Sequence, residues 1–286
     1  LDGSYDLNRE TYNGELTLSR FPLDRFLTVD SLGSASANFR LEGRYFSWPQ
    51  AKTSVNAGIR QLFYKEHEYK DITLQATLDK THLRGTMVSK DPDAPLDLVF
   101  RGDSLQQQYQ VGLGGYIGKV DLQALHLMQE PLTMGLKVDL QGFIGEHSAY
   151  ALKARFDSLS MADSRKTYTL GSLDIDMASD LKKTTLDVKT GDLQLTFRAD
   201  TSLAGFGESA GKIAGIVGKQ IAGKDIDMEQ IKAELPVFSM HLKGDQNNAI
   251  AKFLKARNMG FRRLSLDIVS RQRSGIRMGI TATAPY

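Results

Sequence analysis

The chain has 286 residues, of which 41% are hydrophobic, and this is enough to bury a sizeable core in one large domain or two smaller ones. Its formal net charge of +2 argues against attraction of the whole chain to nucleic acid. The absence of cysteine excludes disulfides, thiolate nucleophiles and cysteine-ligated metal sites.

The first residues, 1–10, contain neither a basic stretch nor an apolar run, so they do not form a secretory signal peptide. They start without Met and inside a repeated pattern, and we therefore expect the sequence to be a piece of a longer protein. No run of about 18 apolar residues occurs, so we expect no membrane-spanning helix in this piece.

Similar short segments recur along the chain. The pentapeptide LDGSY at 1–5 returns as LEGRY at 41–45 and, more weakly, as LQGFI at 140–144. The octet LDLVFRGD at 96–103 returns as LQLTFRAD at 193–200, and a third set lies at 69–74, 170–175 and 261–266. Their loose spacing is typical of strand arrays joined by turns of variable length.

Apolar and polar residues alternate within these segments, and the side chains of a strand point alternately to its two faces. Turn signals at 90–95, 145–147 and 189–192 separate the alternating runs. The pattern therefore predicts an antiparallel meander with one apolar face. The residues that we expect on this face are Ile72, Leu74, Leu96, Leu98, Phe100, Leu173, Ile175, Leu193, Leu195, Phe197, Leu264 and Leu266.

Two shapes satisfy a sheet with one apolar and one polar face. The sheet closes into a sandwich or barrel and buries its apolar residues against itself, or it stays open as a curved trough that holds something apolar. The alternation alone is compatible with both.

The pattern changes from Leu203 onward. Apolar residues at Ile213, Ile216, Val217 and Ile221 have helical spacing and predict an amphipathic helix over 211–222. Its glycines each lower helix stability by about 1 kcal/mol relative to Ala, so the helix needs a surface to lie on. Asp227 is predicted to cap a second helix that ends near Pro236, and a third capped helix is predicted to end at Gly260.

These observations predict a mainly β fold with a helical insert and a mixed α+β carboxyl third. We divide the chain into an antiparallel β-repeat region at 1–203, an amphipathic helical segment at 204–235, and a β-α-β-β closing segment at 236–286.

The sequence does not contain the motifs that are associated with catalysis or cofactor binding. The segment FGESAGKIAG has Phe206 and Ile213 where a phosphate-binding loop needs Gly and a hydroxyl residue. The glycine run at 112–118 is interpreted as a bend between strands, and RGD at 101–103 as part of a strand. His67, between two glutamates, is interpreted as part of a solvated edge, in preference to a weak cation site. We expect no metal site, no cofactor, no catalytic residue and no enzymatic activity.

The carboxyl end is basic. From 243 to 277 there are nine Lys and Arg against two Asp, and the basic patch consists of Arg262, Arg263, Arg271, Arg273 and Arg277. It suits anionic lipid head groups or an acidic partner, and equally a solvated face that keeps edge strands from pairing. No aromatic ladder lies between the basic residues, so we expect no binding of nucleic acid.

The repeated Leu-x-Gly-x-Tyr and Leu-x-Leu-x-Phe-Arg-x-Asp strands lead into the Gly/Ala/Lys-rich helix and then AELPVFSMHLKG. In this combination the chain resembles the periplasmic part of a TamB-like protein of the Bacteroidetes type, within the AsmA-like superfamily. The resemblance implies a curved, open β-groove of the repeating type, whose apolar residues face lipid. It also implies a periplasmic location and an inner-membrane anchor formed by an amino-terminal helix that is absent here.

The function implied by the resemblance is outer-membrane biogenesis. It includes transfer of phospholipid acyl chains and assistance to outer-membrane protein assembly with an Omp85-type partner. Two other functions remain open from the residues alone: a closed β-sandwich that serves as a binding or adhesion module of the cell envelope, and an enzyme acting on envelope carbohydrate.

Overall fold

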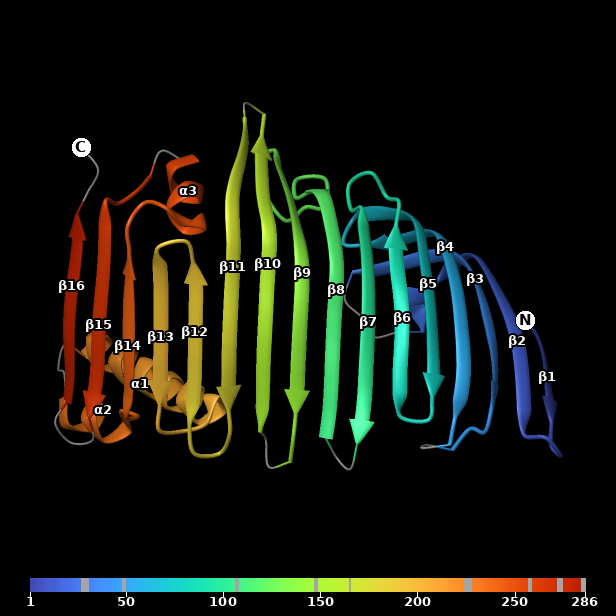
Figure 1. Ribbon diagram of the computed structural model, residues 1–286, viewed down its shortest axis with the longest axis horizontal. Helices are drawn as coiled ribbons and strands as arrows, with labels where there is room; N and C mark the ends of the chain where they lie inside the picture. Colours follow the sequence, from blue (N-terminus) through green and yellow to red (C-terminus); the bar gives the residue numbers. More distant parts are fainter. Residues whose placement is uncertain are drawn as a thin grey trace. The chain divides into compact units, whose positions relative to one another are not determined.

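The computed structural model describes residues 1–26, 31–47, 50–105, 108–146, 149–164, 166–223, 228–256, 259–271 and 275–283. Figure 1 shows the strands arranged side by side in chain order. The predicted helix cap Asp227, the patch residue Arg273 and His147 lie outside the described residues.

Sixteen strands of the described ranges are hydrogen-bonded in chain order, from β1 to β16. The mainly β fold, the antiparallel meander in an open sheet and the helical insert are therefore confirmed. The first eight strands are β1 (Asp2–Asp6), β2 (Thr11–Pro22), β3 (Leu32–Arg44), β4 (Lys52–Tyr64), β5 (His67–Asp79), β6 (His82–Ser89), β7 (Leu96–Leu105) and β8 (Gln108–Asp121). The others are β9 (Leu132–Ile144), β10 (Tyr150–Asp163), β11 (Thr167–Ser179), β12 (Thr184–Thr190), β13 (Leu193–Ala199), β14 (Phe238–Gly244), β15 (Arg263–Arg271) and β16 (Gly275–Thr283).

The chain forms two compact units. Unit 1 comprises Leu1–Gln141 and Phe156–Thr169, and unit 2 comprises Gly142–Arg155 and Leu170–Tyr286. The sequence-based division at residues 203 and 235 stays a prediction, and the two units are described separately below.

The local irregularities of unit 1 include a register shift in β2, and a tight turn precedes β5. The register shifts between Leu18 and Phe21 in β2, where Arg20 has a φ of 47°. Such a bulge bends its strand and increases the local twist. The turn between β4 and β5 consists of Lys65 and Glu66, with φ values of 49° and 66°. Positive φ at both central residues is the geometry of a type I′ hairpin turn, and it makes His67 the first residue of β5.

The glycine run at 112–118 lies inside β8, so its interpretation as a bend between strands was wrong. The reason is the close approach of neighbouring β7. A Cβ on Gly112 would lie 2.6 Å from Arg101 Nε, and one on Gly115 would lie 2.1 Å from the carbonyl oxygen of Asp97. At Gly115, glycine is needed because the backbone of β7 leaves no room for a side chain, whereas at Gly112 the Arg101 side chain fills the space.

All three α-helices of the described residues belong to unit 2, namely α1 (Leu203–Gly223), α2 (Met228–Glu234) and α3 (Ala249–Ala256). Helix α1 begins at Leu203, eight residues before the predicted start. Ser202 caps it, because its Oγ accepts from Gly205 N–H at 3.0 Å. Helix α3 ends at Ala256 rather than at Gly260. None of the helices in the described ranges has the length and apolar character needed to cross a membrane.

Candidate functional site: two apolar cross-strand rows

In unit 1, one line of apolar side chains crosses six neighbouring strands. The register places partners opposite one another from β2 to β7, and partners on adjacent strands share a face. We call this line the unit 1 row, and it consists of Leu16, Phe39, Ala57, Leu74, Met87 and Leu98. Since strands lie about 4.8 Å apart, the row is about 24 Å long.

In the described part of unit 1, the large side chains of the row are only half-buried. Leu16, Leu74 and Leu98 are half-buried. The buried hydrophobic residues that the structure describes before Leu125 are five alanines, namely Ala35, Ala37, Ala51, Ala57 and Ala94. The buried large hydrophobic residues described in unit 1 lie outside β2–β7, at Leu125, Leu132, Val138, Leu159 and Met161. The row therefore keeps part of its apolar surface exposed over β2–β7.

Unit 2 repeats the arrangement. Here the register places apolar partners opposite one another across β11 to β16. We call this line the unit 2 row, and it consists of Ile175, Val188, Leu195, Leu242, Leu266 and Ile280. None of these six side chains is buried. Leu98 and Leu195 are the third residues of the two octet copies, and each belongs to the row of its unit. Leu98 is the last member of the unit 1 row, on β7, and Leu195 is the third member of the unit 2 row, on β13.

Helix α1 covers one side of the unit 2 row. The Phe206 ring lies 4.9 Å from the Phe197 ring and 5.3 Å from the Phe238 ring, in edge-on geometry. Phe197 and Phe238 share the apolar face of β13 and β14, and Phe197 is buried. The helix therefore lies against the ends of these strands and leaves Leu195 half-buried.

Helix α3 covers the other side. Asn248 caps it by accepting from Ala251 N–H at 2.7 Å, and Ala249 N–H donates to the buried Thr190 Oγ1. Asp192 accepts from Asn248 Nδ2 at 2.7 Å and from Asn247 N–H at 2.8 Å. Burial of Asp192 disfavours its charged form, but these hydrogen bonds outweigh burial and lower the pKa of the carboxyl. Figure 1 shows α1 and α3 at opposite ends of the strands between them.

The twelve predicted apolar residues fall into two groups, one in each unit. In unit 1, Leu74 and Leu98 belong to the row, Ile72 and Leu96 lie beside it on the same face, and the Phe100 ring lies over Gly85. In unit 2, Ile175, Leu195 and Leu266 belong to the row. The remaining four are neighbours of this row on the same face, with Leu193 and Phe197 buried, and these four are Leu173, Leu193, Phe197 and Leu264.

The opposite face is polar and carries ion pairs between neighbouring strands. Examples are Arg40 with Glu15 at 2.9 Å, Arg198 with Asp187 at 2.6 Å and His241 with Asp267 at 2.7 Å. The hydrogen bond from His241 lowers the pKa of Asp267. Exposed ion pairs of this kind contribute little to the stability of the fold. We therefore interpret this face of the sheet as a hydrated surface.

The predicted basic patch is divided between the ends of β15. Arg262 and Arg263 lie at its start, where they line a surface depression of about 510 Å³ with Asp245, Gln246 and Thr283. Arg271 ends the strand, about 26 Å away at the usual rise per residue. Arg277 is its diagonal neighbour on β16. The four described arginines therefore form two smaller groups.

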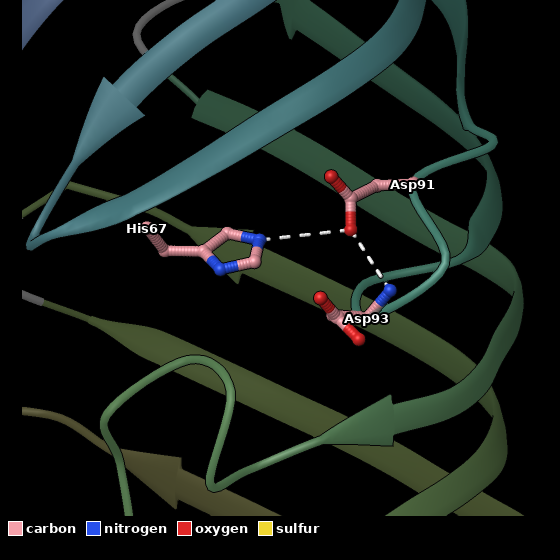
Figure 2. Close-up of side chains that lie close together, drawn as sticks. All are labelled: His67, Asp91 and Asp93. Atoms are coloured by element: carbon pink, nitrogen blue, oxygen red, sulfur yellow. Dashed lines mark hydrogen bonds and ion pairs between the residues drawn. The ribbon is translucent and has the colours of Figure 1, made fainter.

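The interpretation of His67 as a solvated edge was wrong, because its side chain is only 10% exposed. Its neighbours come from the loop between β6 and β7 rather than from Glu66 and Glu68. His67 Nε2 lies 3.6 Å from Asp91 Oδ1, and Figure 2 shows His67, Asp91 and Asp93 turned toward one another. Local sequence offers no sign of this cluster, since the loop is more than twenty residues away along the chain.

No protein-family model, curated protein or solved structure matches the chain.

Proposed function

We propose that the two apolar rows bind the acyl chains of phospholipids. In this proposal the chain is a periplasmic segment of a TamB-like protein that takes part in outer-membrane biogenesis. The role is one of binding rather than catalysis. The larger protein is anchored in the inner membrane and supports lipid transport or outer-membrane protein assembly with an Omp85-type partner.

The observation that carries the proposal is the half-exposed unit 1 row, with alanines as the buried hydrophobic residues described before Leu125. Contiguous apolar surface on this scale is a binding surface in soluble proteins. Its residues offer no hydrogen bond and no charge. The unit 1 row therefore suits an extended apolar ligand that needs no polar groups for recognition.

The length of the rows fits this ligand. Half of a bilayer's hydrocarbon core is about 15 Å thick, so the length that an acyl chain spans in a bilayer is shorter than a row of about 24 Å. Each methylene withdrawn from water contributes about 0.8 kcal/mol. Twelve methylenes that are half covered on an open face contribute about 5 kcal/mol, before the cost of ordering the chain. This affinity is weak enough to release lipid, as a transfer protein requires.

The test is co-purification of lipid. The chain is expressed with an export signal, purified without detergent and examined by native mass spectrometry, and the bound material is extracted for lipid analysis. The proposal expects phospholipid adducts and saturable binding of a fluorescent fatty acid by the delipidated chain. A single lipid-free mass together with no saturable fatty-acid binding contradicts it.

A further inference from the structure

We propose that His67, Asp91 and Asp93 of unit 1 bind one divalent transition-metal ion of the zinc and manganese class. Each residue offers one ligand atom, and the three atoms lie within 4.8 Å of one another. The cluster is separate from the apolar rows, so this proposal does not depend on the proposed function.

The distance between two of the ligand atoms favours a metal over a hydrogen bond. His67 Nε2 and Asp91 Oδ1 are 3.6 Å apart, which is too long for a hydrogen bond. Two ligands bound to one tetrahedral ion at about 2.1 Å are about 3.4 Å apart. The observed spacing is therefore close to one edge of a metal coordination polyhedron.

The imidazole nitrogen that points into the cluster makes no hydrogen bond. His67 is 9% exposed, and its Nε2 is one of the buried polar atoms in the described residues that make no hydrogen bond. The ring is held by Tyr69, whose ring lies 4.5 Å away in edge-on geometry. A buried nitrogen without a partner is costly, and a metal ion satisfies its lone pair.

Asp91 is positioned by the backbone. Its Oδ1 accepts from Asp93 N–H at 2.9 Å and Ala94 N–H at 3.1 Å, and its Oδ2 accepts from Lys70 N–H at 2.7 Å. Oδ1 thus accepts two hydrogen bonds and Oδ2 accepts one, so the free acceptor position of the carboxylate lies on Oδ2. An ion bound at Oδ1 takes the place of one of its two N–H bonds. Burial of Tyr69 and the negative charge of Asp91 raise the pKa of the Tyr69 hydroxyl, as expected beside an ionised carboxylate.

Asp93 completes the set from the accessible side. It is half-buried, its N–H donates to Asp91 Oδ1, and its carbonyl oxygen accepts from Asp121 N–H at 2.8 Å. Its backbone is thus fixed independently of its carboxyl group. Figure 2 shows this carboxyl beside the imidazole, on the side away from the Asp91 backbone.

The ligand set indicates the class of ion. One imidazole nitrogen and two carboxylate oxygens suit Zn²⁺ or Mn²⁺, whereas Ca²⁺ takes six to eight oxygens. Three protein ligands leave at least one position for water. The ion joins the first residue of β5 to the loop between β6 and β7, so it acts as a clamp between these elements and raises the melting temperature.

The test is calorimetric titration of the chelator-treated chain with Zn²⁺ and with Mn²⁺, followed by thermal denaturation. We expect one ion per chain, with no comparable binding of Mg²⁺ or Ca²⁺. Asp93→Asn is expected to weaken Zn²⁺ binding at least tenfold and to remove the Zn²⁺-dependent rise in melting temperature. His67→Gln is expected to weaken Zn²⁺ binding and to remove the rise in melting temperature to the same extent.

Two matched variants serve as controls. His82→Gln removes a histidine that is paired with Asp103 on the exposed face, and Asp97→Asn removes an exposed carboxylate near the same loop. Both are expected to bind Zn²⁺ as the wild-type chain does. The proposal is overturned if the wild-type chain binds no stoichiometric ion, or if Asp93→Asn binds it with unchanged affinity. Asp93→Asn keeps the backbone hydrogen bonds to the Asp91 carboxylate, because none of them uses the Asp93 side chain. It therefore tests the site even if His67→Gln does not fold.

Discussion

Replacing Leu98 by Asp tests whether the unit 1 row is an open binding surface. Leu98 is half-buried in this row, and its neighbour Val99 is 56% exposed on the opposite face of the same strand. Leu98→Asp therefore places a carboxylate in the path of an acyl chain, whereas Val99→Asp places the same group on the polar face. The two variants introduce the same charge and differ only in the face of the sheet on which it lies.

The magnitude follows from the geometry of the row. Loss of two half-covered methylene contacts removes about 0.8 kcal/mol. Partial desolvation of the new carboxylate beneath the acyl chain adds about 1–3 kcal/mol. The sum of about 2–4 kcal/mol corresponds to fatty-acid binding that is roughly 30-fold to several-hundred-fold weaker. Since the introduced carboxylate stays hydrated in the lipid-free chain, the variant should fold and lose only a few degrees in melting temperature.

The assay is fluorescence titration with a labelled fatty acid, with circular dichroism and thermal denaturation as the fold control. Val99→Asp is expected to bind as the wild-type chain does. Equal binding by all three chains shows that acyl chains do not lie on this row. If Leu98→Asp unfolds while Val99→Asp remains folded, the face is a sealed core, because a buried unpaired charge is not tolerated there.

Three further predictions concern stability. Asn248→Ala removes the cap of α3 and should cost about 1 kcal/mol, measured by denaturant unfolding, with faster hydrogen exchange in α3. The lowered pKa of Asp192 stabilises the folded state at pH values above the unfolded pKa of about 3.9, and this contribution should disappear as the pH falls through the pKa of the folded state. In Asp192→Asn, the free energy of unfolding should therefore depend less on pH in this range, as measured by denaturant unfolding at several pH values. Gly85→Ala should destabilise by about 1–3 kcal/mol, because its Cβ would lie 2.3 Å from the Phe100 ring, while Gly58→Ala, with open space around it, should not.

The strands and the faces of their side chains could be predicted because period-two alternation is a local signal. The two octets contribute to β7 and β13, and their third residues, Leu98 and Leu195, each belong to the row of their unit. The choice between an open and a closed sheet could not be derived from alternation, since it depends on whether a second layer covers the apolar face. The same pattern is compatible with both outcomes.

Features set by contacts between distant residues were missed or misread. His67 was interpreted from its neighbours Glu66 and Glu68, whereas its surroundings are set by Asp91 and Asp93. The glycines of β8 suggested a bend because Gly is favoured in turns, but here they make room for β7. Helix α1 starts eight residues before the predicted position, because the regular apolar spacing used for the prediction begins only at Ile213. The only local sign of the true start is the capping residue Ser202.

The central claim is that acyl chains lie along the two rows, and photo-crosslinking tests it most directly. A fatty acid carrying a diazirine near its methyl end is bound to the chain and irradiated, and the labelled residues are located by peptide mass spectrometry. The account predicts labels on apolar-face residues such as Leu74, Leu98, Leu195 and Leu242, reduced by excess unlabelled phospholipid. Labels confined to polar-face residues such as Val99 and Thr196, or labelling that phospholipid does not reduce, would contradict it.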